Sequence, residues 1–130
     1  MTFRYARYSD DILRPVIPIA LHHGANILDY EVLIDSGADL NIFGYQVGEY
    51  LGIDPTHGRM ATMMGATGEP QDFYIHPITI EVAGLTFEAQ AGFAKALDDK
   101  PYGIVGQQGF FDLFQITFNL AREEIELKQP

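Results

Sequence analysis

The chain has 130 residues, enough for one domain with a hydrophobic core but not for two. Apolar residues make up 47% and charged residues 20%, as in a globular protein rather than a disordered one. The formal charge of −10 argues against nucleic acid or an anionic membrane as a partner, because clustered Lys and Arg hold phosphate groups. The absence of cysteine excludes disulfides, a thiol nucleophile and cysteine-based zinc sites.

The N-terminal segment does not look like a targeting signal. Residues 1–11 alternate charged and aromatic side chains and contain no apolar run of signal-peptide length. The longest apolar run, Val16–Leu21, is interrupted by Pro18 and is far shorter than the ~20 residues of a membrane helix. We therefore expect a cytoplasmic protein with no membrane partner.

The first half of the chain predicts two strands and a helix. Strands are expected over Val16–Leu21 and Ile27–Ile34, with a turn at residues 22–26 between them, because apolar side chains alternate in the second strand. Apolar residues at helical spacing predict a helix over Ile42–Leu51, with Gly52 as its C-cap.

The second half predicts further strands and a terminal hairpin. Strands are expected over Phe73–Val82, with a break at Pro77, and over Thr86–Phe93. Phe110–Phe114 is expected to form one or two helical turns, and residues 115–130 alternate as a hairpin does. The sequence thus predicts a mostly β fold with one or two short helices.

One segment carries the residues on which chemistry could depend. An apolar strand ending in Val32–Ile34 runs directly into Asp35, Ser36 and Gly37. A carboxylate at the end of a buried strand is costly unless it is hydrogen-bonded or shares a proton. Ser36 offers a hydroxyl beside it, and Gly37 allows a main-chain N–H to approach a carboxylate. The tripeptide alone is more typical of a simple turn than of a site, so its flanks decide the interpretation.

Those flanks resemble a known family. Val32–Asp39, followed by the apolar pair Ile42-Phe43, resembles the active-site segment of retropepsin-like aspartic proteases, in which apolar residues precede Asp-Thr/Ser-Gly-Ala. Gly103–Phe111 resembles the apolar-apolar-Gly segment that crosses behind the active-site loop of that family. Met63–Glu69 lies where the family carries its flap hairpin. The resemblance spans residues 16–119 in the order of elements, and two short segments match in detail.

The resemblance implies a single-lobed acid-protease β-barrel that forms a homodimer, with residues 1–130 as one retropepsin-like domain. The chain contains one Asp-Ser-Gly, so the two catalytic carboxylates would be Asp35 from each of two chains. They would activate a water for hydrolysis of a peptide bond, with Ser36 and Gly37 supporting the loop. No cofactor and no metal are implied.

The substrate implied by the resemblance is a peptide or protein in an extended conformation. The residues that would contact it come from the active-site loop, the flap and the second motif. They are Gly37, Ala38, Asp39, Met64, Gly65, Ala66 and Ile104.

Two departures from the family pattern concern the dimer. Viral members usually have Arg after the glycine of the second motif, paired with the acid that matches Asp39, whereas this chain has Gln107. The chain also continues past Asn119, so residues 115–130 form either a terminal extension or a dimerisation hairpin.

Two alternatives stay open. One is a non-catalytic dimeric domain that binds peptides or proteins on the same fold, since a fold does not determine a function. The other is an unrelated β-barrel interaction protein in which Asp35 lies in an ordinary turn. Pairing of Asp35 with its copy in a dimer would distinguish the protease from both.

The four histidines do not predict a metal site. Adjacent residues of a strand point to opposite faces, and no cysteine or regularly spaced carboxylate completes a set of ligands. Surface or turn positions are therefore expected for His22, His23, His57 and His76.

Overall fold

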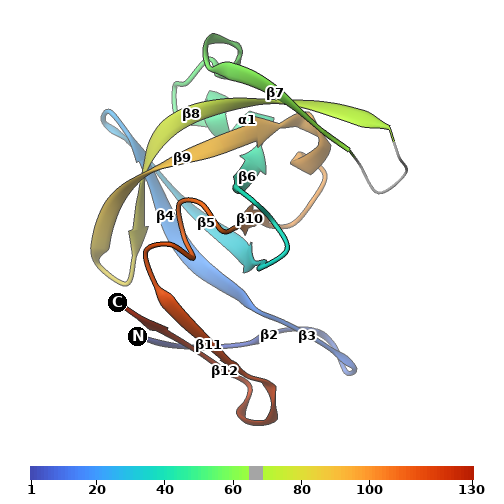
Figure 1. Ribbon diagram of the computed structural model, residues 1–130, viewed down its shortest axis with the longest axis vertical. Coiled ribbons are helices and arrows are strands. Elements are labelled where there is room, and N and C mark those ends of the chain that lie inside the picture. The colour runs from blue at the N-terminus through green and yellow to red at the C-terminus, as the bar shows by residue number, and fades with distance from the viewer. Residues whose placement is uncertain (65–68) are drawn as a thin grey trace.

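The largest sheet of the molecule forms a barrel. The computed structural model describes residues 1–64 and 69–130. The strands of this sheet are, in chain order, β4 (Val16–His23), β5 (Asn26–Ile34), β6 (Asn41–Gly44), β7 (Arg59–Met64), β8 (Pro70–Val82), β9 (Leu85–Ala94) and β10 (Gly103–Val105). They lie in the order β4-β5-β10-β6-β9-β8-β7, and a further pairing of β4 with β8 closes the sheet (Figure 1). The mostly β barrel predicted from the sequence is confirmed.

Helical structure is limited to short segments between strands. The described residues form the α-helix α1 (Tyr45–Tyr50) and the single-turn 3-10 helices η1 (Pro55–His57), η2 (Lys95–Leu97) and η3 (Leu120–Arg122). Gly52 follows the C-cap residue Leu51 with φ +80°, a backbone conformation that glycine adopts without strain. The predicted end of the helix is therefore correct to within one residue.

The predicted start of that helix is wrong. Ile42 and Phe43 lie in β6, all four residues of which are buried between β9 and β10, and the helix begins only at Tyr45. A short strand buried on both faces is a continuous apolar run, and such a run has no period that separates it from a helix.

Two other local predictions need correction. Strand β8 continues through Pro77 without a break. Pro77 lies between the part of β8 that pairs with β7 and the part that pairs with β4, so only β9 flanks it there and a missing N–H is tolerated. Strand β4 likewise extends to His23, which shortens the predicted turn at 22–26. The prediction for Phe110–Phe114 agrees with the structure: the segment forms one turn, in which the Phe114 N–H donates to the Phe110 carbonyl at 3.1 Å.

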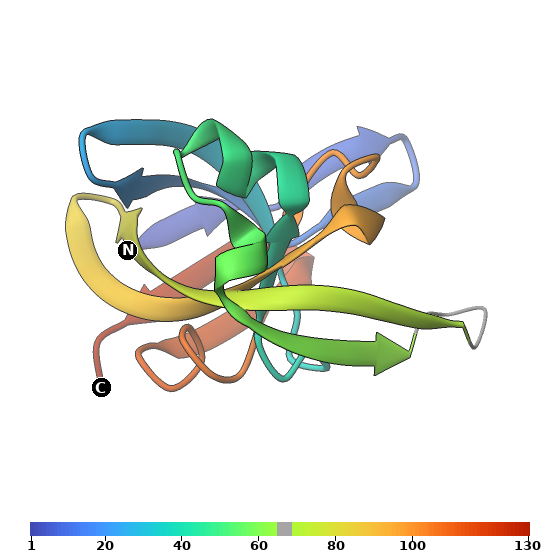
Figure 2. The same cartoon turned by 90° about the horizontal axis from the view of Figure 1, so that it is seen from above.

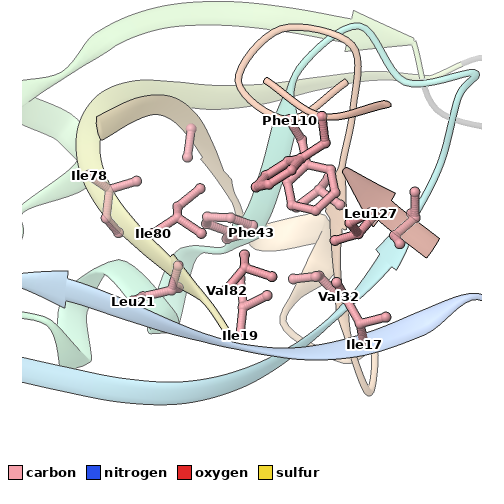
Figure 3. Close-up of a cluster of buried hydrophobic side chains, with 14 of the residues drawn as sticks. Ile17, Ile19, Leu21, Val32, Phe43, Ile78, Ile80, Val82, Phe110 and Leu127 are labelled. Atoms are coloured by element: carbon pink, nitrogen blue, oxygen red, sulfur yellow. The ribbon is translucent and has the colours of Figure 1, made fainter. Parts of the chain in front are cut away.

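The hydrophobic core fills the barrel and reaches the C-terminal strand. Side chains from β4, β5, β6 and β8 converge inside the barrel, and Phe110 and Leu127 pack against them (Figure 3). Ile125 and Leu127 are both 0% exposed. Burial of an aliphatic side chain contributes about 1.5–3 kcal/mol, so the C-terminal strand is an integral part of the folded chain.

A second, smaller sheet gathers both ends of the chain. Its strands are β1 (Thr2–Arg4), β11 (Gln115–Asn119) and β12 (Glu124–Lys128), in the order β1-β12-β11. Phe3 pairs with Ile125, and β11 and β12 form an antiparallel hairpin. The first and last strands of the chain consequently lie side by side (Figure 1).

Two hairpins extend beyond the barrel. Strands β2 (Ala6–Ser9) and β3 (Ile12–Arg14) pair only with each other among the described residues. Strands β7 and β8 together form an arm that projects from the barrel in both views (Figures 1 and 2). In the part of the chain that the structure describes, the helices are too short to cross a membrane.

Candidate active site

The loop after β5 carries the Asp-Ser-Gly segment and is anchored at its first residue. The Asp35 N–H donates to the Val105 carbonyl oxygen in β10 at 3.0 Å, which extends the parallel pairing of β5 and β10. The Ala38 N–H donates to the Asp35 carbonyl oxygen at 3.1 Å and closes a turn over Ser36 and Gly37. Asp35 is thereby held, half-buried, at the end of a buried strand.

The Asp35 carboxylate accepts a main-chain hydrogen bond from within the turn. The Gly37 N–H donates to Oδ1 at 2.9 Å. Hydrogen bonds to a carboxylate are among the stronger ones in proteins, so this contact fixes the orientation of the side chain. A Cβ on Gly37 would lie 3.2 Å from the same oxygen and would crowd it. Ser36 and Gly37 are exposed, so this end of the loop is part of the molecular surface.

The segment after β10 supports the loop from behind, as expected from the second motif. The Gln107 N–H donates to the Ala38 carbonyl at 2.8 Å, and the Gln108 N–H donates to the Asp39 carbonyl at 2.9 Å. A Cβ on Gly106 would lie 2.5 Å from the Ala38 carbonyl oxygen. Only glycine permits this close crossing of two main chains, which explains the glycine of the Ile-Val-Gly motif.

Asn41 connects the same two segments from the inside, and sequence reasoning missed it. Its side chain is fully buried, with 0% exposure. Oδ1 accepts from the Gly106 N–H at 3.1 Å, and Nδ2 donates to the carbonyls of Gln90 and Gly109 at 3.3 and 3.2 Å. An amide inside an otherwise apolar run was the signal that could have revealed it, because a buried amide requires partners.

Gln107 adds a side-chain contact to the loop. Its Nε2 donates to the Ser36 carbonyl oxygen at 2.7 Å. The amide therefore reaches the turn itself, on the residue directly after Asp35. Where the family pattern has an arginine, this chain has a neutral side chain that donates a hydrogen bond to the main chain. Asp39, which matches the acid that pairs with that arginine, is exposed.

A cavity of about 370 Å³ lies beside the loop. Loop, barrel and arm all contribute to its wall, and its lining residues are Ala38, Asp39, Leu40, Ile42, Thr62, Phe73 and Ile104. Three of the predicted substrate-binding residues, Ala38, Asp39 and Ile104, are thus brought together. Thr62 and Phe73 were not predicted, because their positions depend on how β7 and β8 pair. A mostly apolar pocket with one carboxylate suits an apolar side chain with a polar neighbour.

Of the other predicted contacts, Gly37 lies in the loop itself and Met64 lies in the arm. Met64 is the last residue of β7, and its main chain pairs with Pro70 of β8. Gly65 and Ala66 lie outside the described residues. Thr62 and Asp72 link the two strands of the arm through a hydrogen bond of 3.2 Å.

A larger hollow of about 620 Å³ lies elsewhere, between β4, β5 and the β8–β9 turn. It contains three acidic residues, Asp29, Glu31 and Glu81, and none of the loop after β5. Position beside Asp35 rather than size therefore selects the smaller cavity as the candidate site.

The histidines lie away from this loop. His22 contacts Glu81 at 2.8 Å, and the rings of His23 and His76 meet edge to face at 6.0 Å. Within residues 1–64 and 69–130, histidine, aspartate and glutamate side chains form no group of three that could hold a metal ion.

We compared the sequence and the structure with known proteins. No family model matches the sequence. A search of curated proteins found no match either. Solved structures do match. A retropepsin-like aspartic protease from Rickettsia conorii is 18% identical, with a TM-score of 0.69 over 98% of this chain and 89% of that one. EIAV protease complexed with the inhibitor HBY-793 is 20% identical, with a TM-score of 0.51 over 78% of this chain and 88% of that one. The chain therefore has the single-lobed fold of retropepsin-like aspartic proteases.

Proposed function

We propose that this protein is an aspartic endopeptidase that acts as a homodimer. One observation carries the proposal: in a retropepsin-like fold, the Asp35 carboxylate is fixed by the Gly37 N–H beside a largely apolar cavity. In this proposal residues 1–130 form one domain, including the terminal hairpin.

The proposal requires two chains. Peptide hydrolysis by paired carboxylates needs two of them close together, and the sequence has one Asp-Ser-Gly. A two-fold axis beside the loop supplies the second Asp35 from an identical chain. Two carboxylates that lie close together share one proton, so one of them acts as the base and the other as the acid.

The reaction then proceeds in two steps. The ionised Asp35 removes a proton from a water, whose oxygen bonds to the carbonyl carbon of the substrate, while the protonated Asp35 gives its proton to the carbonyl oxygen. In the second step the Asp35 that received the proton from water gives it to the amide nitrogen, the C–N bond breaks, and the other Asp35 takes a hydroxyl proton as the carbonyl reforms. The products are a carboxylic acid and an amine, and each Asp35 returns to its starting state.

The surrounding residues receive supporting roles. Ser36 and Gly37 hold the turn that carries Asp35. An extended peptide would lie along Gly37, Ala38 and Asp39, with one apolar side chain in the cavity that Ile104 lines. The arm of β7 and β8 would act as a flap, and Met64, Gly65 and Ala66 would contact the substrate from it. Closure of such a hairpin excludes water from the reacting groups.

The experiment is mass-spectrometric cleavage profiling of a peptide library with the wild type and Asp35→Asn. The substitution keeps the shape of the side chain but removes its ionisation, so we expect turnover to fall by at least ~100-fold. Asp99→Asn is the matched control, since its side chain is 82% exposed and lies outside the loop, and it should retain wild-type turnover. Unchanged cleavage by Asp35→Asn would contradict the proposal. Peptide binding without cleavage by the wild type would favour the non-catalytic alternative.

A further inference from the structure

The terminal sheet decides how a second copy can join. Strand β12 has β1 of its own chain on one side and β11 on the other. Its buried residues Ile125 and Leu127 also belong to the core of the same chain. The C-terminal strand therefore has no free edge and cannot insert between strands of another copy without first unfolding its own sheet. An extension of the terminal sheet into a second copy must therefore use β1 or β11.

The two outer strands differ in how well they are protected. Among the described residues, no strand pairs with the outer edge of β1 or of β11. Strand β1 is three residues long, carries Arg4 and leads directly into β2 and β3. Strand β11 is five residues long and has no charged residue and no proline, although charged residues make up 20% of the chain. Exposed edges in native proteins are usually blocked by charges, prolines or short length, so β11 is the edge left open.

Exposed apolar side chains accompany this open edge. Phe118 in β11 is 41% exposed, and Leu120, which follows it in η3, is 59% exposed. Both belong to the short group of large hydrophobic residues that remain exposed in the single chain. Their position at an unpaired strand is what a partner strand would cover.

The hydrogen bonds of the sheet show which main-chain groups face outward. The Leu127 N–H donates to the Met1 carbonyl at 2.8 Å, and the Leu127 carbonyl accepts from the Met1 amino group at 2.9 Å. Leu127 therefore directs its main-chain groups to β1. Because these directions alternate along a strand, Glu126 directs its groups to β11.

The same alternation continues in β11. Thr117 lies opposite Glu126, so the main-chain groups of Thr117 point to β12. Those of its neighbours, Ile116 and Phe118, point to the free edge. The open edge thus presents one N–H donor and one carbonyl acceptor on each side of Thr117.

We propose that β11 pairs with β11 of a second copy, antiparallel about a two-fold axis at Thr117. The proposal rests on the proposed function, which requires two copies. In this register Ile116 exchanges two hydrogen bonds with Phe118 of the partner subunit, and the two-fold axis repeats them. Every outward group of Ile116 and Phe118 is then satisfied, and the two terminal sheets merge into one continuous sheet.

The proposed β11–β11 pairing, called the seam below, is rigidly connected to the candidate site. The segment between β10 and β11 folds back on the crossing behind the loop, where the Phe111 N–H donates to the Gly106 carbonyl and the Asp112 N–H to the Gln107 carbonyl, both at 3.1 Å. Phe114, directly before β11, is buried in the core. Pairing of β11 therefore fixes the position of the loop that carries Asp35 relative to its copy.

The test is sedimentation analysis over a range of concentrations for the wild type, Phe118→Pro and Thr2→Pro. Proline at 118 removes an outward N–H and leaves the pairing with β12 intact, so a folded monomer is expected, with the dimer dissociation constant raised at least ~100-fold. Thr2→Pro is the matched control: Thr2 lies opposite Glu126, so its N–H points away from β12 on the other edge. It should remain dimeric. A Phe118→Pro dimer of wild-type strength, or a Thr2→Pro monomer, would overturn the seam.

Two further variants make the result decisive. Should Phe118→Pro fail to fold by circular dichroism, Phe118→Lys decides, because it places like charges beside the two-fold axis. A folded Phe118→Lys monomer supports the seam, and a dimer of wild-type strength overturns it. Asp35→Asn should remain dimeric and inactive. A cleaving Asp35→Asn dimer would overturn the proposed function and leave the seam intact, so the two failures are distinguishable.

Discussion

The loop around Asp35 and the terminal sheet differ in how their main-chain N–H and carbonyl groups are paired. Behind the loop, main-chain groups of the two crossing segments form hydrogen bonds with each other. The Asn41 side chain forms hydrogen bonds with three more main-chain groups. In the terminal sheet, β12 is paired on both sides while β11 keeps one open edge. The chain thus holds the loop through its own contacts and leaves an open edge on β11, where a second copy is proposed to join. Variants that damage the loop should therefore cost stability in the monomer, whereas variants at the β11 edge should cost association.

The largest effect on the loop is expected from Gly106→Ala. The new Cβ would lie 2.5 Å from the Ala38 carbonyl and 2.6 Å from that of Leu40, and main chain cannot yield as a flexible side chain does. We expect a loss of about 3 kcal/mol or more in the free energy of unfolding, measured by urea denaturation. Gly84→Ala is the control, with open space around its Cβ and φ +86°, and should cost only about 1–2 kcal/mol. Equal losses in the two variants would show that the crossing is looser than described.

Asn41→Ala should have the next largest effect. It leaves the Gly106 N–H and the carbonyls of Gln90 and Gly109 without their side-chain partner in a buried site. Unsatisfied buried groups cost about 1–3 kcal/mol each before water or relaxation compensates, so a total loss of about 3 kcal/mol is expected in thermal or urea unfolding. The same substitution at Asn119, which caps η3 from an exposed position, should cost about 1 kcal/mol. A smaller loss at position 41 than at 119 would contradict the role of Asn41.

Gln107→Ala should affect activity more than stability. It removes the hydrogen bond to the Ser36 carbonyl but keeps the main-chain bond of residue 107. We expect a loss of about 1 kcal/mol and a severalfold fall in kcat, because the turn that carries Asp35 gains freedom. Gln107→Glu should be worse, since a carboxylate would face a carbonyl oxygen. Gln108→Ala is the control, and a fall in kcat there as large as at 107 would refute a specific role for the amide.

The smallest effect concerns a carboxyl group remote from both regions. The hydrogen bond from the Thr56 hydroxyl lowers the pKa of the Asp54 carboxyl below its ordinary value. A lowered pKa contributes stability that is present above the ordinary value and is lost as pH falls through the lowered one. Thr56→Val should therefore raise the pKa of Asp54 in an NMR titration, while Thr86→Val should not. An unchanged pKa in Thr56→Val would assign the shift to another cause.

The sequence predicted a mostly β fold and a strand that ends at Asp35 because both are local or repeated patterns. The barrel and the position of the Ile-Val-Gly segment behind the loop followed from the resemblance to retropepsin-like proteases. The role of Asn41 and the contribution of Phe73 to the cavity depend on strands far apart in the chain, and no local pattern encodes such pairings. The short strand at Ile42-Phe43 was misread because a buried run of this length has no diagnostic period.

The open edge of β11 also lay beyond sequence reasoning. Alternation predicts a hairpin over residues 115–130 but not which side of it the N-terminal strand covers. Only the observed order β1-β12-β11 shows that the last strand is enclosed and that the strand before it is exposed.

The central claim is that two Asp35 side chains from different chains form one site. Folded Asp35→Asn chains should be added in increasing amounts to wild-type enzyme, with time for subunits to exchange, and peptide cleavage should be followed. Mixed dimers should be inactive, so cleavage should fall to about half when the two chains are equal in amount and towards zero when Asp35→Asn is in excess. Cleavage that stays constant per wild-type chain at every ratio would contradict the shared site.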